Sequence, residues 1–371
     1  MEKSYVTLKE IAQQGEMWLN TLGRIEEKRK EIDAFLEEIK TKHGNIRVVF
    51  TGAGTSNYVG DVVQPYLREK QAHGFEYESI PTTDLVSSPY EYIQNRPTLL
   101  VSFARSGNSP ESVAAVALYE DLVDDLYQIV ITCAEEGQLA RHAREGANTL
   151  LLLLDERTND RGFAMTSSFT SMTLATLLLF DETTSEQKRA YVEEIVAMGE
   201  YVKEESEQFR ELVEEGFKRV VYLGSGVLSK LAREAQLKIL ELTGGKIATC
   251  FDSSMGFRHG PKSFVDSQTL VVDFVSNNAY TRLYDVDIIT ELKSDGIAKL
   301  VYPVSTDREL DGFVFRRGEV VPDAYLSLPF VMIAQYISTY AAMHLDNDVD
   351  NPSASGTVNR VVKGVVIHPY K

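Results

Sequence analysis

Short runs of apolar residues alternate with longer helical segments along most of the chain. "RVVFTGAG" at 47–54, "TLLVSF" at 98–103 and "YQIVIT" at 127–132 are near-continuous apolar runs, typical of strands that are buried on both faces of a parallel sheet. Between such runs, "SPESVAAVALYEDL" at 109–122 has the composition of a helix. "VLSKLAREAQLKILELT" at 227–243 has apolar positions at helical spacing. This alternation predicts an α/β fold in which a parallel sheet is flanked by helices.

The same order of apolar runs occurs a second time. "RVVYLGSG" at 219–226, "TLVVDF" at 269–274 and "AKLVYP" at 298–303 match the three earlier runs at offsets of 172, 171 and 171 residues. Offsets that are so nearly constant indicate two copies of one supersecondary plan. We therefore expect two tandem domains, each with three layers, in which helices cover both faces of a parallel sheet.

The remaining segments predict how the copies are joined. Residues 6–44 have a helical pattern, and residues 185–216 read as one charged helix whose apolar side packs on a domain. The turn-rich segment 346–364 near the end of the chain is expected to be a loop. We expect N-terminal helices at 1–45, a first domain at 46–195, a connecting helix at 196–216 and a second domain with a C-terminal active-site tail at 217–371.

Composition narrows the function classes. The 371-residue chain is 25% charged and 43% apolar, which is typical of a globular protein. Its formal net charge of −17 argues against a nucleic acid or an anionic membrane surface as partner. Two cysteines without CxxC spacing indicate neither a disulfide framework nor a zinc ribbon, and the six histidines show no metal-ligand spacing. Because the sequence has no secretory h-region and no apolar run of about 18 residues, we expect a cytoplasmic protein. We also expect that it needs no metal and no cofactor.

Glycine and hydroxyl residues follow two of the predicted strands in the first copy. "TGAGTSNYVG" at 51–60 and "ARSGNS" at 104–109 place Ser56, Ser106 and Ser109 where helices begin, which is where anions bind. Such clusters are also ordinary turns and N-caps, but two of them at neighbouring strand ends favour a phosphate site. The lysine of a P-loop is missing. Because the second copy keeps "GSG" but has "VSNNAY" after its second apolar run, we expect one phosphate site per chain.

These motifs resemble a known family. "TGAGTS", "SFARSGNSPES", "GSGVLSKLAREAQLKILELT" and "FRHGPKSF" together look like a pair of sugar isomerase (SIS) domains. The pattern is most similar to the galactosamine-6-phosphate deaminase/isomerase family, often labelled tagatose-6-phosphate ketose/aldose isomerase. More distantly, it resembles the isomerase half of glucosamine-6-phosphate synthase. The resemblance extends over nearly the whole chain.

The resemblance implies a set of substrate-binding residues. The family's phosphate-binding positions fall on Ser56, Arg105, Ser106, Gly107 and Ser109. Arg105 stands where the synthase has glutamine, and an arginine could add charge-assisted hydrogen bonds to the phosphate. "AMTSSFTS" at 164–171 is similar to a third sugar-facing loop, so that the expected sugar-facing residues are Thr55, Asn108, Thr166 and Ser167.

The resemblance also implies three catalytic residues, Glu241, His259 and Lys363. A carboxylate can shuttle a proton between C1 and C2, and we expect apolar surroundings for Glu241 because its helix neighbours are apolar. Histidine suits the proton transfer of ring opening, and His259 lies in a glycine-flanked segment where a defined turn is expected. The separation of Glu241 from His259 is two residues longer than in the synthase. In this fold the histidine tends to reach the neighbouring subunit, which implies a homodimer or dimer of dimers with a shared active site.

The expected reaction converts D-galactosamine 6-phosphate to D-tagatose 6-phosphate and ammonia. Only residues 1–45 precede the first copy, so we expect no domain that supplies ammonia, and removal of nitrogen is favoured over its addition. Two alternatives stay open: a ketose/aldose isomerase of neutral hexose 6-phosphates, and a sugar-phosphate sensor without turnover. All three candidate catalytic residues are present, which favours an enzyme. The residues leave open the preference between galacto and gluco epimers.

Overall fold

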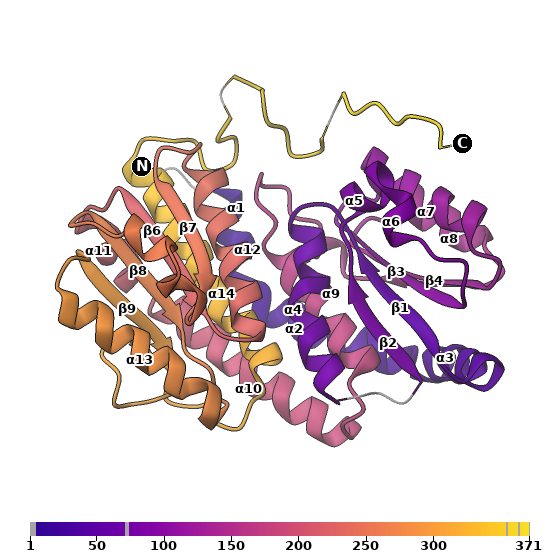
Figure 1. Cartoon of the computed structure of the whole chain (residues 1–371), viewed down its shortest axis with the longest axis horizontal. Coiled ribbons are helices and arrows are strands. Elements are labelled where there is room, and N and C mark those ends of the chain that lie inside the picture. Colours follow the sequence, from indigo (N-terminus) through magenta and orange to yellow (C-terminus); the bar gives the residue numbers. More distant parts are fainter. Residues whose placement is uncertain (1–4, 71–73, 354, 363, 371) are drawn as a thin grey trace. The chain divides into compact units, whose positions relative to one another are not determined.

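The computed structural model of the chain describes residues 5–70, 74–353, 355–362 and 364–370. The chain forms two compact units, each built around its own sheet (Figure 1). The β1–β5 unit consists of Met17–Asp160, Ser167–Thr184 and Val358–Lys371, and the β6–β10 unit consists of Met1–Glu16, Arg161–Thr166 and Ser185–Thr357. Both units therefore combine distant segments of the chain, and the domain boundaries given above stay predictions.

The β1–β5 unit has a sheet of five parallel strands in the order β2-β1-β3-β4-β5. Strands β1 and β3 are buried along their whole length, because helices cover both faces of the sheet. The elements of this unit are α2 (Gln14–Glu27, whose first turn belongs to the other unit), α3 (Arg29–His43), β1 (Ile46–Thr51), α4 (Thr55–Lys70), β2 (Phe75–Ser79), α5 (Thr82–Ser87), α6 (Pro89–Tyr92), β3 (Thr98–Ala104), α7 (Pro110–Leu122), β4 (Leu126–Thr132), α8 (Gln138–Glu145), β5 (Thr149–Leu153), the 3-10 turn η1 (Glu156–Thr158) and α9 (Ser167–Phe180).

Alternate residues of these strands enter two different cores. Val49 and Leu100 pack with residues of α5, α7 and α8 on one face of the sheet. Phe50 points to the other face, where its ring stacks on Phe103 and meets the edge of Phe180 from α9. The period of two along each strand is therefore satisfied by apolar contacts on both sides.

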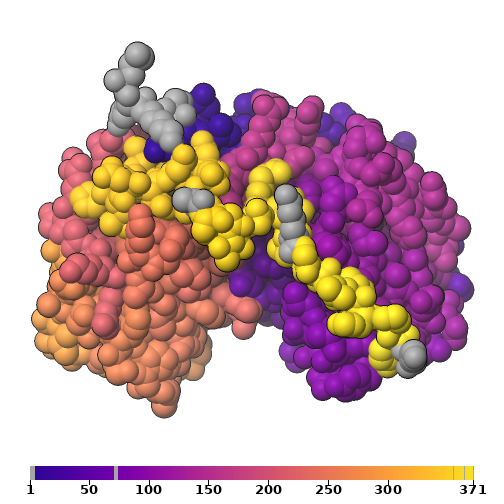
Figure 2. Space-filling view, turned by 90° about the horizontal axis from the view of Figure 1, so that it is seen from above, coloured from indigo at the N-terminus to yellow at the C-terminus, as the bar shows by residue number. Residues whose placement is uncertain are grey.

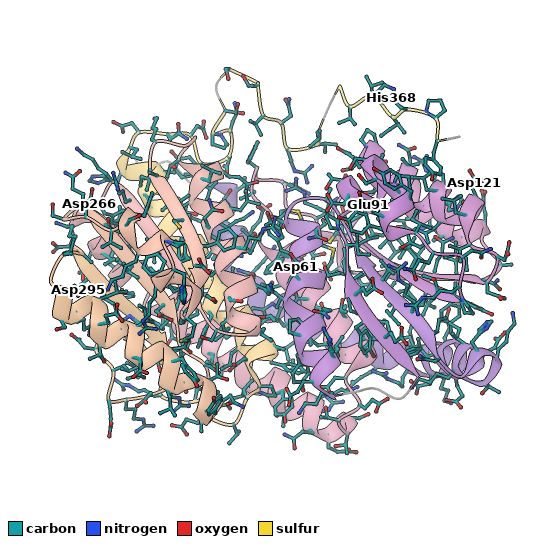
Figure 3. All side chains as sticks on the ribbon, in the orientation of Figure 1. Asp61, Glu91, Asp121, Asp266, Asp295 and His368 are labelled. Carbon is teal, nitrogen blue, oxygen red and sulfur yellow. The ribbon has the colours of Figure 1, made fainter. Side chains whose placement is uncertain are left out.

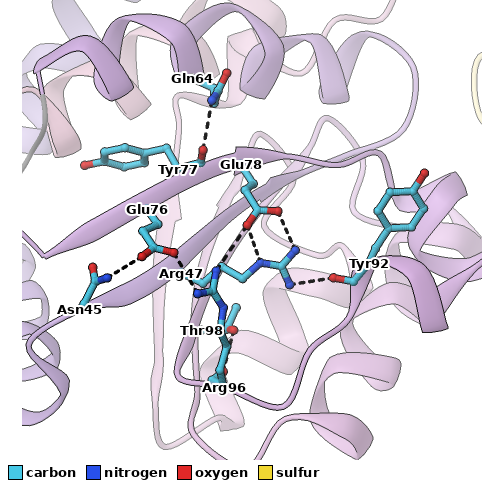
Figure 4. Close-up of polar contacts among 9 residues, drawn as sticks. All are labelled: Asn45, Arg47, Gln64, Glu76, Tyr77, Glu78, Tyr92, Arg96 and Thr98. Carbon is cyan, nitrogen blue, oxygen red and sulfur yellow. Dashed lines mark hydrogen bonds and ion pairs between the residues drawn. The ribbon is translucent and has the colours of Figure 1, made fainter.

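A buried arginine joins β1 to β2 near the start of β1 (Figure 4). Arg47 is 3% exposed and makes two hydrogen bonds to the Glu78 carboxylate, of 2.9 and 2.7 Å. A third bond of 2.7 Å runs to the main-chain oxygen of Tyr92. The fork of the guanidinium matches the carboxylate, so that this pair helps to fix the register of the two strands.

The β6–β10 unit has the same strand arrangement, in the order β7-β6-β8-β9-β10. Its apolar residues again fill two cores, one beneath α13 and one beneath α14. The elements are α1 (Val6–Ala12), α10 (Ser185–Glu204), α11 (Glu207–Glu214), β6 (Arg219–Gly224), α12 (Val227–Leu242), β7 (Ala248–Ser253), the 3-10 turns η2 (Gly256–Arg258) and η3 (Pro261–Phe264), β8 (Thr269–Phe274), α13 (Ala279–Asp295), β9 (Leu300–Ser305), β10 (Phe313–Val314) and α14 (Asp323–His344).

Helix α14 is the central helix of this unit. Among the described residues it alone is long and apolar enough to cross a membrane, but 94% of its most apolar window is buried within the structure. A helix that is apolar all round is what the core of a large domain requires. The α14 pattern is therefore explained by packing inside the unit.

The α/β prediction is confirmed, and the three matched pairs of apolar runs lie on β1 and β6, β3 and β8, and β4 and β9. The N-terminal segment is helical as predicted and forms α1, α2 and α3. The prediction of one helix over 185–216 is wrong. The chain turns at Glu205–Ser206 and continues as α11, which lets that helix bury Phe209, Leu212 and Val213.

Candidate functional site

The two loops that were predicted to bind phosphate leave neighbouring strands. Strand β1 pairs with β3 in parallel, and Thr51 lies opposite Ser102 at the end of the pairing. Parallel neighbours present their carboxyl ends at the same edge of a sheet, where ligands bind in folds of this type. The loops that hold Ser56 and Ser106 therefore start side by side, as predicted.

The β1–α4 loop is compact because glycines permit a close turn. A Cβ on Gly52 would lie 2.6 Å from the Ser56 carbonyl carbon, and Gly54 has a φ of +57°. Thr55 and Ser56 are the first two residues of α4 and are 4% and 6% exposed. Asp61 of α4, labelled in Figure 3, accepts a hydrogen bond of 2.7 Å from the Ser79 hydroxyl at the end of β2, which ties the helix to the sheet. Ser56 thus lies at a helix N-terminus, as predicted.

The β3–α7 loop holds Ser106 and Ser109 at the start of another helix. Gly107 has a φ of +67°, which turns the chain after Ser106. Ser109 is the N-cap of α7, and its hydroxyl makes no capping hydrogen bond, so this hydroxyl is not committed to the helix end. Asn108 has a bracing contact instead: its side-chain oxygen accepts the Gln138 N–H at 3.1 Å, from the first residue of α8. The loop offers an N-terminal helix end with hydroxyl groups beside it.

Arg105 makes a contact within the protein that the sequence did not predict. It is 7% exposed, and its Nη2 donates a hydrogen bond of 2.7 Å to the main-chain oxygen of Arg360 in the C-terminal segment. The Nη2 group of Arg105 is therefore engaged by a main-chain carbonyl group of the protein. The sequence contains no signal for this contact, since the two residues are 255 positions apart.

The predicted third loop is partly helical. Ser167 is the first residue of α9, so that residues 167–171 form the start of a buried helix and not a loop. Asp160 accepts the main-chain N–H groups of Ser167 and Ser168 at 3.0 and 2.9 Å. This carboxylate fills the anion position of the α9 N-terminus. Thr166 and Ser167 are 1% and 0% exposed.

Glu241 lies on α12 in the β6–β10 unit and belongs to a charged triad. The Lys238 ammonium lies 2.7 Å from Glu241 Oε2 and 3.3 Å from Glu234 Oε1, and both Lys238 and Glu234 are completely buried. Burial alone would lower the pKa of Lys238, but the two carboxylates outweigh it and raise that pKa above its ordinary value. The expected apolar surroundings of Glu241 are wrong: Leu240 beside it is 41% exposed, and the Glu241 carboxylate binds a lysine.

Sequence reasoning missed Lys238 and Glu234. The signal was present, because positions 234, 238 and 241 are spaced by four and three residues and lie on one helix face. A Glu–Lys–Glu series within an otherwise apolar helix face indicates a buried ion pair. Lys238 holds the Glu241 carboxylate in place and keeps a positive charge next to it.

His259 lies in a defined turn of the same unit, as expected. The residue is exposed, its N–H donates to Gly256 O at 2.9 Å, and Gly260 after it has a φ of +125°. The turn is held on α13 by ion pairs on both sides of the histidine. Arg258 Nε lies 2.7 Å from Glu291, and Lys262 Nζ binds Glu291 and lies 2.5 Å from Asp295, which is labelled in Figure 3. Lys363, the third predicted catalytic residue, lies outside the described residues.

The corresponding strand ends of the β6–β10 unit are filled by the protein itself. Asp285 of α13 accepts hydrogen bonds of 2.5 Å from the hydroxyls of Ser225 and Ser254, and of 3.0 Å from the N–H of Ser276. These donors follow β6, β7 and β8, where a ligand would bind in this fold. Burial and the nearby Asp285 raise the pKa of Asp273, at the end of β8, well above its usual value. The Asp285 carboxylate thus takes the place of an external anion in this unit.

Among the described residues, no group of His, Cys, Asp and Glu side chains is arranged to hold a metal ion. The chemistry available on the described residues is that of hydroxyl and amide donors in the β1–β5 unit, and of a carboxylate, an ammonium and an imidazole in the β6–β10 unit. Hydroxyl and amide donors can bind an anion, and carboxylate, ammonium and imidazole groups can transfer protons.

This chain is similar in sequence and in fold to known proteins. The family model described as SIS domain matches residues 42–181. The D-galactosamine-6-phosphate deaminase AgaS of Escherichia coli is 43% identical over 374 residues, which cover 98% of this chain and 96% of that protein. The solved structure of tagatose-6-phosphate ketose/aldose isomerase from Escherichia coli is 38% identical, with a TM-score of 0.89 and coverage of 99% and 98%.

A more distant solved structure shares the fold. The C-terminal domain of glucosamine-fructose-6-phosphate aminotransferase from Francisella tularensis has a TM-score of 0.74 at 19% identity, covering 94% of this chain and 98% of that one. The resemblance seen in the sequence motifs is therefore confirmed. The chain belongs to the family of double-SIS-domain proteins that includes the AgaS D-galactosamine-6-phosphate deaminases.

Proposed function

We propose that this chain is an enzyme that converts D-galactosamine 6-phosphate and water to D-tagatose 6-phosphate and ammonia. The observation that carries the proposal is the 43% identity to the Escherichia coli deaminase over 98% of this chain. The strand-end loops supply donors for the substrate's phosphate, and the triad on α12 supplies a carboxylate for proton transfer. Because a sugar phosphate is charged and does not cross a bilayer readily, we expect the enzyme in the cytoplasm, with its substrate.

In the proposed mechanism the phosphate is a handle. The main-chain N–H groups and hydroxyls of Ser56, Ser106 and Ser109 hold it at the ends of β1 and β3. No bond to phosphorus is made or broken, so a P-loop lysine has no task here. Binding energy from this remote group is available to orient C1 and C2 of the sugar.

Proton transfer is assigned to the β6–β10 unit. His259 moves a proton between O5 and O1 as the ring opens, and Glu241 takes the C2 proton and delivers it to C1. A proton of the substrate's ammonium group passes to O1, so the C1 aldehyde becomes an alcohol and C2 becomes an iminium carbon. Water adds to C2, the C2–N bond breaks, ammonia is released, and C2 becomes the carbonyl carbon of a ketone. Lys238 donates a hydrogen bond of 2.7 Å to Glu241 Oε2 and so positions the carboxylate that must accept the first proton.

The role of Glu241 can be tested with isotopes. Substrate that carries deuterium at C2 should yield tagatose 6-phosphate with part of the deuterium at C1, because one carboxylate handles both steps. Glu241→Gln should lose turnover and keep binding of the sugar phosphate, as measured by calorimetry. Full activity of Glu241→Gln would contradict the assignment.

We also propose a homodimer, or a dimer of dimers, in which His259 serves the site of the neighbouring chain. The support is that His259 is exposed and that the turn presenting it is held rigidly on α13. Inactive Ser106→Ala/Glu241→Gln and His259→Ala chains would then restore activity when mixed, because one site of the mixed dimer receives all native residues. No recovery on mixing, despite exchange of subunits, would place His259 in the site of its own chain.

A second function is favoured by one observation. The solved relative at 38% identity is named a tagatose-6-phosphate ketose/aldose isomerase. An enzyme of that kind would use the same base and release no ammonia. Exchange of solvent deuterium into tagatose 6-phosphate, without ammonia release from the amino sugar, would favour it. Binding without either reaction would indicate a sensor.

A further inference from the structure

The C-terminal segment is attached to the β1–β5 unit at Arg360. Its Nε donates a hydrogen bond of 2.9 Å to the main-chain oxygen of Asp160, and its Nη2 donates to the same oxygen and, at 3.1 Å, to Asn159 Oδ1. Of the described residues from 358 to 370, all except Arg360, Val361 and Val365 are exposed. Figure 2 shows the last, yellow residues lying over the surface of the violet part of the chain. Arg360 is therefore a fixed point in a segment that is otherwise exposed.

Arg105 completes this attachment from the other side. Arg105 is a buried residue, and its guanidinium donates to the Arg360 main-chain oxygen at 2.7 Å. A charged donor forms a stronger hydrogen bond with a carbonyl oxygen than a neutral donor does. The phosphate loop and the C-terminal segment are thus joined directly, by the residue that precedes Ser106.

Asp160 extends the same contact to a third segment. While its main-chain oxygen accepts from Arg360, its carboxylate accepts the N–H groups that open α9 at Ser167 and Ser168. Three segments that are far apart in the sequence, each expected to face the sugar, are therefore linked by a series of hydrogen bonds through Arg360 and Asp160. They are the phosphate loop, the start of α9 and the C-terminal segment.

We propose that Arg360 is a positioning residue that docks the C-terminal segment onto the phosphate loop. In this proposal Arg105 binds the main-chain oxygen of Arg360 and is not a phosphate ligand. The catalytic part of this inference rests on the proposed function, because Arg360 lies three positions before Lys363, the lysine that the family resemblance places in the reaction. The docking itself depends only on the contacts described above. Arg105 thereby links the predicted phosphate loop to the segment that contains Lys363 in the sequence.

The docking can be measured without substrate. A lysine-specific protease binds several residues before the bond that it cuts, so cleavage after Lys363 requires Arg360 to leave its contacts. The loss of residues 364–371 is visible by mass spectrometry of the intact chain. Arg360→Gln and Arg105→Gln should each increase the cleavage rate about 10- to 100-fold, because each removes a charged hydrogen bond and cleavage follows the population of the open form. Arg360→Lys, which keeps one charged donor, should show a smaller increase.

The matched control is Arg144→Gln. Arg144 of α8 also donates to a main-chain oxygen and to a carboxylate, both of Glu135, in the same unit. Its loss should leave the cleavage rate at the wild-type value. Ser106→Ala should do the same, because that variant changes the phosphate loop and leaves the docking contact intact. Circular dichroism melting of each variant identifies any general loss of folding.

Turnover gives the second readout. Arg360→Gln and Arg105→Gln should lower kcat, by about 100-fold if the misplacement reaches an ångström, with KM close to the wild-type value. If Arg105→Gln raises KM and is cleaved at the wild-type rate, Arg105 is a phosphate ligand and the proposal is wrong. Unchanged cleavage of Arg360→Gln would also overturn it. If the wild type released no ammonia, the proposed function would fail while the cleavage result still decided the docking.

Discussion

Replacing Lys238 with methionine is the most informative single perturbation of the β6–β10 unit. The Lys238 side chain is 1% exposed, and its ammonium lies 3.3 Å from the Glu234 carboxylate and 2.7 Å from that of Glu241. Methionine fills a similar volume without the charge. The Glu241 side chain is 25% exposed and can gain water, whereas Glu234 is 0% exposed and would become an uncompensated buried carboxylate.

The magnitude follows from that asymmetry. Removing one partner of a buried ion pair costs about 3–5 kcal/mol of unfolding free energy, mostly because the remaining charge has no counter-charge. For a unit of this size each kcal/mol corresponds to about 2–4 °C in Tm, so that Lys238→Met should lower Tm by about 6–20 °C. Adding Glu234→Gln should recover part of the loss, with a coupling energy of about 1–3 kcal/mol, because the neutral amide needs no counter-charge.

Urea unfolding and thermal melting of four proteins measure this effect. They are the wild type, Lys238→Met, the Glu234→Gln/Lys238→Met double variant and Lys230→Met, where Lys230 is an exposed lysine on the same helix. The exposed control should change stability by less than about 0.5 kcal/mol. If Lys238→Met were no less stable than the control, or if the double variant were no more stable than Lys238→Met, the triad would not be held together by charge.

Three further predictions concern the strand ends and the sheet edge. Ser106→Ala should raise KM about 10- to 100-fold with kcat nearly unchanged, because one hydrogen bond to a charged phosphate is lost; steady-state kinetics with a lower kcat and normal KM would contradict this. Hydrogen bonds from Arg47 lower the pKa of Glu78, so this pair stabilises the fold above the unfolded pKa of about 4.3 and loses that contribution as pH falls through the lower folded value. Urea midpoints of Glu78→Gln should therefore fall less steeply in acid than those of the wild type, and parallel curves would refute it. Asp285→Ala leaves three hydrogen-bond donors without their acceptor, so added formate should bind there and raise the Tm of this variant. The Tm of Asp273→Asn should not respond to formate, and an equal response of the two variants would show that no anion position had been opened.

Much of the fold was predictable because its buried strands consist mostly of apolar residues that follow one another in the sequence. A strand buried on both faces, such as β3, tolerates few polar residues, so its limits are visible in the sequence. The break between α10 and α11 was missed because nothing at Glu205–Ser206 is a strong helix breaker. The chain bends there because α11 gains contacts for Phe209 and Leu212, and such contacts depend on the rest of the unit.

The candidate site was predictable where the chemistry lies within one local motif. The two serine loops and the glycine-flanked turn at His259 are of this kind, since helix starts and glycine turns have local signals. The partners of Arg105 and Asp285 come from distant segments, so the sequence could not show them. Glu241 shows the limit most clearly: its apolar neighbours in sequence lie on other faces of α12, and its partner in space is Lys238.

The measurement that tests the central claim most directly is ammonia release from D-galactosamine 6-phosphate by the purified chain, with D-glucosamine 6-phosphate alongside. The account predicts release with formation of a ketose 6-phosphate, faster from the galacto compound, and its loss in Glu241→Gln. A folded protein that releases no ammonia from either sugar would contradict the account.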